Sequence, residues 1–340
     1  MRIAIHNNNK TFSDRWISYC KAQHIPYKIV DCYQSDIIQQ LADCDALMWH
    51  FHHAGSKSML MAKQLLYSVK ATGKKVFPDF ETVWHFDDKV GQKYLLEAID
   101  APLVPSYAFY TKNEALEWAD NTDFPKVFKL RGGAGSSNVK LARTKSDAIK
   151  LIRQSFGRGF SPYEGWSNLN ERIRKYRNGK TSLFDVFKGV IRLFHTTDFA
   201  KVVGRERGYT YFQDFIANND SDVRVIVIDE KAFAIKRMVR KNDFRASGSG
   251  EIFYEKELFD LETIKLSLDI ASKLHTQCVA LDFVYQNEKP LVVEISYGFS
   301  VDGYDPCVGY WSSDMAWHEG SFNPQGWMVE SIIKSIADHK

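Results

Sequence analysis

Two carboxylates lie close together near the end of the chain, each inside an apolar segment typical of a β-strand. Asp282 lies within 279–285 and Glu294 within 291–296, and a turn at 286–290 separates the two segments. An unpaired buried charge is costly, so two buried acids in one hairpin suggest a shared cation. Oxygen ligands suit Mg²⁺, which commonly acts beside substrate phosphates. The alternative is a hairpin whose strand alternation turns both acids to solvent.

A glycine-rich loop at 131–138 lies upstream, between strands expected at 124–130 and 139–142. Small residues let a backbone approach an anion, and successive N–H groups can hold a phosphate. No Gly-Lys-Ser/Thr ends the loop and a strand follows it. It is therefore neither a Walker loop nor a dinucleotide fingerprint. Taken alone, the loop is better explained as a flexible turn.

A third group of strands lies between these two features. Strands are expected at 211–216, 222–228 and 232–239, with a polar loop at 242–250 behind them. In this order and spacing, the elements resemble the ATP-grasp superfamily of carboxylate–amine ligases. The ribosomal-protein glutamate ligase branch is the closest likeness, and glutathione synthetases and D-alanine–D-alanine ligases are further away. The resemblance covers about 87–300.

The resemblance implies a nucleotide site made of two lysines, the glycine loop and a hinge. Lys89, which opens an expected helix, and Lys129, on the strand before the loop, match lysines that contact phosphates. The loop residues implied to close over the β- and γ-phosphates are Gly132, Gly133, Gly135, Ser136 and Ser137. The hinge implied to hold adenine and ribose comprises Gln213, Asp214, Phe215 and Ile216, and Asp214 stands where the family prefers Glu.

The same likeness implies a reaction centre. Asp222 and Arg224 match an Asp-x-Arg pair at the nucleotide and the reacting groups. Arg245 matches an arginine that would stabilise the transferred phosphoryl group or the tetrahedral intermediate. Lys236 is a third candidate catalytic residue, together with Arg224 and Arg245.

Asp282 and Glu294 match the family's metal ligands, but the third ligand position departs from the pattern. The family usually has Asn two residues after the glutamate, and this chain has Ser296. A hydroxyl can ligate Mg²⁺, but it is shorter and a poorer donor than an amide carbonyl. Ser296 is therefore expected either as a ligand or as a small residue that leaves room for substrate.

The composition is that of an ordinary globular protein. The 340 residues allow two or three domains. The formal net charge of +3 is too small to indicate nucleic-acid binding. Five scattered cysteines without a C-x-x-C pair indicate buried thiols rather than disulfides or zinc ligands. No signal peptide and no transmembrane segment is recognised, so a cytoplasmic location is expected.

Residues 1–86 alternate between strand and helix patterns, which predicts an N-terminal α/β substrate domain with a parallel sheet. Strands are expected at 2–6, 27–31, 45–51 and 75–78, and helices at 12–23, 36–42 and 56–72. Ligands of open α/β sheets bind beyond the carboxyl ends of the strands. That rule places 7–9, His50, His52 and His53 beside the ATP unit. We expect these histidines to contact substrate; solvated loop histidines are the equal alternative, and zinc is less favoured.

Residues 87–340 are expected to form a two-lobed ATP-grasp domain of α+β type. The small lobe would span about 105–215 and the large lobe about 216–340, ending in a helix at 327–339. The small lobe contains a basic insert at about 156–201 with apolar residues at helical spacing. The insert could pack as an extra helix, contact a membrane surface or recognise an acidic polymer or lipid-linked substrate. The Trp-rich tail at 304–328 could close the core or stack on a sugar.

The resemblance therefore implies an ATP-dependent ligase that joins a carboxylate to an amine through an acyl phosphate and releases ADP and phosphate. ATP and Mg²⁺, or Mn²⁺, are the implied cofactors. The substrates would be a small-molecule or saccharide carboxylate, such as an acidic sugar or polysaccharide precursor, and an amine. A phosphotransferase on the same fold and a nucleotide-binding protein without turnover are the alternatives. Whether the chain forms a homo-oligomer is left open.

Overall fold

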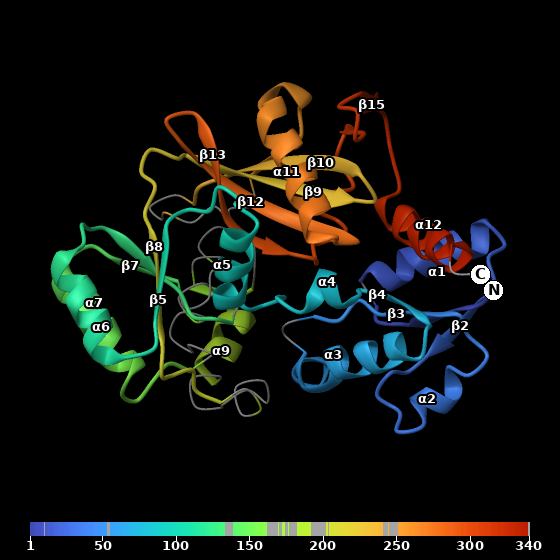
Figure 1. The fold of residues 1–340 in the computed structure, drawn as a ribbon, viewed down its shortest axis with the longest axis horizontal. Helices are drawn as coiled ribbons and strands as arrows, with labels where there is room; N and C mark the ends of the chain where they lie inside the picture. Colours follow the sequence, from blue (N-terminus) through green and yellow to red (C-terminus); the bar gives the residue numbers. More distant parts are fainter. Residues whose placement is uncertain are drawn as a thin grey trace.

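The fold of the chain is given by a computed structural model, drawn in Figure 1. The residues it describes are 1–9, 11–52, 55–132, 139–161, 169, 172–173, 176, 182–191, 202, 204–240, 244 and 251–338. The described chain forms a parallel sheet at the N-terminus and two antiparallel sheets after it. The mixed α/β architecture expected from the sequence is confirmed.

The N-terminal sheet has the order β2-β1-β3-β4 and is parallel throughout. Its strands are β1 (Ile3–His6), β2 (Tyr27–Val30), β3 (Ala46–Met48) and β4 (Lys75–Phe77). The helices of this unit are α1 (Phe12–Ala22), α2 (Ile37–Gln40), α3 (Ser56–Ala71) and α4 (Phe80–Val83). The four strands and the helices α1, α2 and α3 lie within their expected ranges, because apolar strands and amphipathic helices alternate here, whereas α4 was not expected.

A small antiparallel sheet follows, with the order β5-β8-β6-β7. Its strands are β5 (Ser106–Phe109), β6 (Lys126–Phe128), β7 (Lys140–Ala142) and β8 (Thr210–Asp214). Helices α6 (Lys112–Asn121) and α7 (Lys145–Ser155) pack beside it. Strand β8 is central although it comes last in sequence, so the expected hinge at its end adjoins the strand that carries the glycine loop.

The large sheet has the order β13-β12-β9-β10-β14-β15, and β11 pairs with β10. Its strands are β9 (Ser221–Ile228), β10 (Lys231–Met238), β11 (Ile252–Phe253), β12 (Cys278–Gln286), β13 (Lys289–Ser296), β14 (Gly309–Trp311) and β15 (Trp317–Glu319). The 3₁₀ turn η1 (Lys256–Leu258) precedes α11 (Leu261–Leu274), which packs on one face, and α5 (Lys89–Ala98) contacts β13. The expected hairpin of β12 and β13 is present.

One hydrophobic core joins the N-terminal unit to the large sheet. It contains Ile3 and Ile5 of β1, Phe12 and Trp16 of α1, and inward residues of β9, β10 and β12. The last helix, α12 (Pro324–Ala337), adds Met328, Val329, Ile332 and Ile336 to the same core. Figure 1 shows α12 beside α1, next to the N-terminus. The expected domain boundary at 86/87 stays a prediction, but α12 packs with the N-terminal unit despite its position in the sequence.

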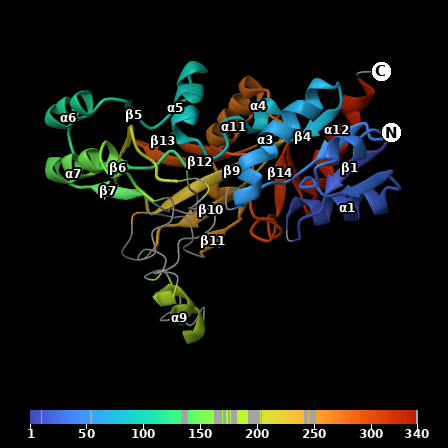
Figure 2. The same ribbon diagram turned by 90° about the horizontal axis from the view of Figure 1, so that it is seen from below.

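The described part of the basic insert includes a helix, α9 (Leu183–Ile191). Figure 2 shows it standing away from the sheets. The side chains of Leu183, Phe184 and Phe187 are more than three-fifths exposed. The five cysteines are all buried and free, as expected. Within the described part of the chain, no helix is both long and apolar enough to cross a bilayer.

Candidate functional site

A single cavity of about 720 Å³ collects most of the residues singled out in the sequence. Its wall takes residues from the N-terminal unit, the small sheet and the large sheet. The expected site residues that line it are Lys89, Lys129, Gln213, Asp214, Phe215, Ile216, Asp222, Arg224, Asp282, Glu294 and Ser296. Residues as far apart in sequence as Lys89 and Ser296 thus surround one space.

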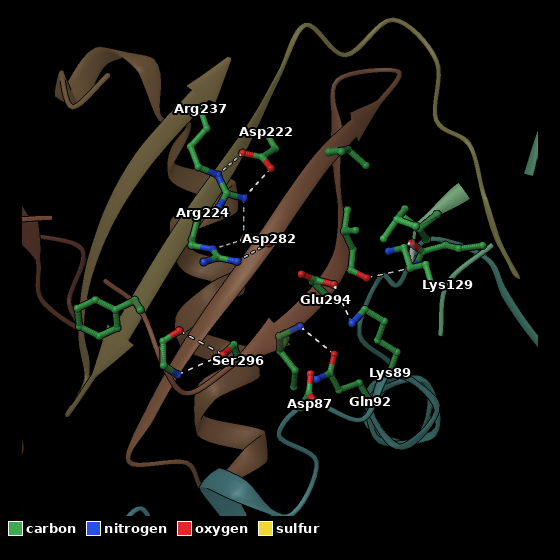
Figure 3. Close-up of a pocket in the computed structure, with 18 of the residues that line it drawn as sticks. Asp87, Lys89, Gln92, Lys129, Asp222, Arg224, Arg237, Asp282, Glu294 and Ser296 are labelled. Carbon is green, nitrogen blue, oxygen red and sulfur yellow. Dashed lines mark hydrogen bonds and ion pairs between the residues drawn. The ribbon is translucent and has the colours of Figure 1, made fainter. Parts of the chain in front are cut away.

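Four charged side chains on β9, β10 and β12 form a continuous ion-pair cluster, shown in Figure 3. Both Asp282 oxygens accept hydrogen bonds from the Arg224 guanidinium. Arg237 makes two bonds of 2.6 Å to Asp222 and lies 3.2 Å from Asp282. Cross-strand register explains the cluster, because Arg224 faces Asp282 on β12 and Asp222 faces Arg237 on β10.

The cluster has strong electrostatic consequences. Burial opposes ionisation of Asp282, but Arg224 and Arg237 hold its pKa well below its usual range. Burial raises the pKa of Asp222, against the effect of Arg237. Asp282, an expected metal ligand, is therefore a firmly ionised carboxylate whose charge is balanced by two arginines.

Glu294 stands beside Asp282, since the two residues are register partners on β13 and β12. Its side chain is about one-third exposed, at 34%, so the expectation that both acids are buried holds only for Asp282. The Lys89 ammonium lies 3.8 Å from the Glu294 carboxylate. Lys89 begins α5, whose N-cap is Asp88, and the Lys89 backbone N–H donates to the Arg131 carbonyl.

Lys129 is the most deeply buried cation of the cavity, with 6% of its surface exposed. Its Nζ donates to the Gln213 side-chain oxygen over 2.7 Å. Burial lowers the pKa of Lys129 to about 8, although Glu294 acts in the opposite direction. A poorly solvated ammonium in a cavity is a strong site for a phosphate oxygen, because little water competes for it.

The expected hinge comprises the last two residues of β8 and the two residues that follow it. The ammonium of Lys126 on β6 lies 2.6 Å from the Asp214 carboxylate and forms an ion pair with it. The sequence alone does not single out Lys126. Phe215 and Ile216 line the cavity, and the Phe215 ring contacts Phe244 edge-on at 6.1 Å between centroids. This end of the cavity is lined by the apolar side chains of Phe215, Ile216 and Phe244, which suits a planar base.

The glycine loop is described only at its start. Gly133, Gly135, Ser136 and Ser137 lie outside the described residues, as does the catalytic candidate Arg245. The N–H groups of Arg131 and Gly132 donate to the Glu206 carboxylate at 3.2 Å each. Glu206, which also accepts from the Tyr209 hydroxyl, therefore fixes the base of the loop. Nothing in the local sequence around Glu206 indicates this role.

Ser296 lines the cavity, but its hydroxyl is engaged within its own turn. Its Oγ lies 3.2 Å from both the N–H and the carbonyl oxygen of Gly298, accepting from the first and donating to the second. The Gly298 N–H occupies one lone pair of this oxygen, so a cation could use only the other one.

Lys236 is not among the cavity-lining residues. On β10, Phe233 and Ile235 belong to the core beneath the cavity face, whereas Ala232 and Ala234 pack on the opposite face. Alternation along a strand therefore places Lys236 away from the cavity and Arg237 toward it. Arg237, which the sequence did not single out, lines the cavity, and a catalytic role of Lys236 stays a prediction.

The N-terminal edge lines the other end of the cavity, as the sheet rule predicts. Thr11, His50 and His52 are part of the wall, and His53 lies outside the described residues. Gln92 on α5 also lines the cavity, and its side-chain oxygen accepts from the Ile295 N–H over 3.2 Å. Among the described residues, no group of three or more His, Cys, Asp and Glu side chains could hold a metal.

Comparison with known proteins identifies related sequences and folds. Residues 195–309 match the model of a family described as a RimK-like ATP-grasp domain. A RimK domain ATP-grasp protein from Sphaerobacter thermophilus has a similar structure, with 14% identity and a TM-score of 0.56 over 98% of this chain and 100% of that one. No curated protein sequence matches the chain.

Two further solved structures extend the comparison. A D-alanine–D-alanine ligase from Bacillus anthracis has a TM-score of 0.57 and 14% identity, with both chains fully covered. The ATP-grasp ligase PsnB, solved with a minimal precursor, Mg and ADP, has a TM-score of 0.54 and 11% identity over 99% of this chain and 98% of that one. At these identities the structures show a shared fold.

Proposed function

Because residues 195–309 match the model of a RimK-like ATP-grasp domain, we propose that the chain is an ATP-grasp ligase that joins a carboxylate to an amine with release of ADP and phosphate. The observation that carries this proposal is the one cavity that brings together buried lysines, paired acids, arginines and the edge of a substrate domain. ATP would occupy the end lined by β8, and the carboxylate and amine would occupy the end lined by the N-terminal unit.

The nucleotide end is supported by Lys89, Lys129 and the hinge. The two ammonium groups would contact phosphate oxygens, and the backbone at Phe215 and Ile216 would meet the adenine. The loop from Gly132 to Ser137 would cover the phosphates. Asp214 and Gln213 would hold the ribose side, although Lys126 already holds one Asp214 oxygen.

Mg²⁺ fits the acidic side of the cavity. Asp282 and Glu294 would hold it, because Mg²⁺ in such sites is bound by one or two carboxylates together with substrate phosphates. When bound, the metal would neutralise charge on the phosphates. Mn²⁺ would suit the same oxygen ligands, and Ser296 would join them through the lone pair that does not accept from the Gly298 N–H.

The proposed reaction has two steps. A carboxylate oxygen attacks the γ-phosphorus of ATP, the bond to the bridging oxygen breaks, and ADP leaves. The amine nitrogen then attacks the acyl carbon, phosphate leaves, and the nitrogen loses a proton. Arg224 and Arg237 face the cavity and would stabilise negative charge on the transferred phosphoryl group. Arg245 would add to that stabilisation.

An alternative is a nucleotide-binding protein without turnover. It is favoured by the engagement of Ser296 with Gly298 and by the pairing of Asp282 with two arginines. A phosphotransferase that stops after the first step is the other alternative.

The substrate itself could be an acidic sugar, a polysaccharide precursor or an amino acid. The exposed apolar side chains of α9 are consistent with contact at a membrane surface by the insert.

Measurement of ADP release separates these functions. The protein would be incubated with ATP and Mg²⁺ against panels of uronic acids, amino acids and amines. ADP release that requires both a carboxylate and an amine supports the ligase. Release with one acceptor alone and formation of a stable phosphorylated product would indicate a phosphotransferase. Binding of ATP in calorimetry with no ADP release under any combination would indicate lost turnover.

A further inference from the structure

His50 lies at the substrate end of the cavity, just beyond the carboxyl end of β3. The side chain lines the cavity although the whole residue is only 5% exposed. Its ring stacks on Phe12 with centroids 3.7 Å apart and planes 9° from parallel, and it meets Tyr297 edge-on at 5.7 Å. Packing on both sides fixes the direction in which the imidazole points.

One ring nitrogen of His50 is committed to the fold. Nδ1 accepts a 3.2 Å hydrogen bond from the backbone N–H of Phe12, the first residue of α1. That N–H is one of the helix donors that have no partner within the helix. A nitrogen that accepts cannot carry a proton, so the neutral ring carries its proton on Nε2.

The other nitrogen is available to a ligand. A Cβ atom placed on Gly298 would lie 3.3 Å from Nε2, so Nε2 adjoins the turn formed by Ser296 and Gly298. Among the described residues, none accepts a hydrogen bond from it. Burial is the main cause, and the nearby His52 the smaller cause, that lowers the pKa of His50 to about 3. The ring is therefore neutral at physiological pH. Nε2–H is therefore a fixed, uncharged donor at the wall of the cavity.

A group that can only donate selects a partner that can accept. An ammonium or protonated amine also only donates, so it cannot pair with Nε2–H, whereas a carboxylate oxygen can. The N-terminus of α1 lies behind the ring. Its partial positive charge also favours an anionic ligand over a cationic one. Of the two proposed substrates, the carboxylate fits this position best, because an ammonium cannot accept and the lone pair of a free amine must point at the acyl carbon.

We infer that His50 binds an oxygen of the carboxylate substrate through Nε2–H and so orients the carboxylate toward the γ-phosphate of ATP. This inference rests on the proposed ligase function. His50 is not required for holding ATP, because the lysines and hinge of the nucleotide end lie at the start of α5 and at the ends of β6 and β8.

Two substitutions separate the role in binding from the role in packing. In His50→Asn, the amide oxygen can replace Nδ1 as the acceptor for Phe12, but no donor reaches the position of Nε2. In His50→Gln, the amide nitrogen can reach the position of Nε2, but the bond to Phe12 is lost. A purely structural role predicts that Gln is the more harmful change, and the inferred role predicts that Asn is.

The experiment uses a carboxylate that supports ADP release. We expect His50→Asn to raise the KM for this carboxylate by about tenfold or more, which is the effect of losing one hydrogen bond to a charged group. In His50→Gln, the KM for the carboxylate should stay within about threefold of the wild-type value. The KM for ATP should stay unchanged in both variants. An unchanged carboxylate KM in His50→Asn, or an equal rise in the KM for ATP, would overturn the inference.

A binding measurement decides the matter even without turnover. Nitrogen NMR of ¹⁵N-histidine-labelled protein, with a non-hydrolysable ATP analogue and Mg²⁺, reports which ring nitrogen is protonated. We expect a proton on Nε2 of His50 and a shift of that signal with acetate, L-glutamate or D-glucuronate. A proton on Nδ1, or no shift with any of the three, rejects the inference. A shift without ADP release would reject the ligase function alone.

Discussion

At the scale of single residues, the metal assignment depends on Glu294. Glu294→Gln keeps the size of the side chain and removes its charge. We expect ADP release to fall to background, because a carboxylate is lost from the pair that would hold Mg²⁺. The free energy of unfolding should change by less than about 1 kcal/mol, since the side chain is one-third exposed.

Steady-state ADP release and urea denaturation measure the two effects. Glu288→Gln is a matched control, because Glu288 is exposed in the turn of the same hairpin. Normal release by Glu294→Gln, with any substrate pair and at any Mg²⁺ concentration, would show the metal assignment to be wrong.

The pKa of Lys129 makes nucleotide binding depend on pH. Because burial lowers this pKa to about 8, the free protein loses the Lys129 charge as the pH rises through that value. A bound phosphate favours the ammonium, so binding above this pH must take up a proton. The affinity for ATP should then fall by up to about tenfold per pH unit above pH 8.

Calorimetric titration with ATP and with adenosine at several pH values checks this expectation. Adenosine affinity should hardly change with pH, since the base does not contact the lysine. In Lys129→Met, ATP should bind more weakly and the pH dependence should disappear. A wild-type ATP affinity that is flat from neutral pH to pH 9 would contradict the assignment of Lys129 to the phosphates.

At the scale of elements, the register of β9, β10 and β12 controls the electrostatics of the cavity. Arg237 and its neighbour Lys236 provide a matched pair on opposite faces of β10. Arg237→Met leaves Asp222 without its buried partner, and loss of one member of a buried ion pair typically costs on the order of 3–5 kcal/mol. Lys236→Met should change the free energy of unfolding by only about 0.5 kcal/mol.

Urea denaturation of the two variants measures this difference, and ADP release tests the role of Lys236. We expect Lys236→Met to retain ADP release, in contrast to our sequence-based selection of Lys236 as catalytic. Equal destabilisation by the two substitutions, or loss of turnover in Lys236→Met alone, would contradict the assignment of Arg237 to the cavity face of β10 and of Lys236 to the opposite face.

At the scale of the whole molecule, α12 connects the end of the chain to its beginning. Ile332 is fully buried in the core that α12 shares with β1, α1 and the large sheet. Ile332→Ala should lower the free energy of unfolding by about 2–5 kcal/mol. Because the core is shared, the N-terminal unit and the large sheet should unfold in one transition.

Circular dichroism and tryptophan fluorescence should give coincident urea curves, because Trp16 lies in that core. Lys334→Ala, on the exposed side of the same helix, is the control and should change the free energy of unfolding by less than about 0.5 kcal/mol. Two separate transitions, with only one shifted by Ile332→Ala, would indicate that the units are independent.

The order and type of most elements could be predicted from local sequence patterns. Strict alternation of apolar strands and amphipathic helices predicted the parallel N-terminal sheet, and the hairpin of Asp282 and Glu294 followed from two apolar runs around a turn. These features are local, because they depend on the period of hydrophobicity and on turn residues within a few positions. The sequence also indicated that His50 would face the ATP unit, through the general rule for open sheets.

Only the tertiary structure decided which charges meet. Arg237 and Asp282 are 45 positions apart, and Lys126 and Asp214 are 88 apart. Their pairing depends on cross-strand register and on the placement of β8 between strands that precede it. A one-residue change of register would turn Lys236 instead of Arg237 toward the cavity. Neither the period of hydrophobicity nor the local composition specifies such long-range pairing, and for that reason the ion-pair cluster and the orientation of His50 emerged only from the folded chain.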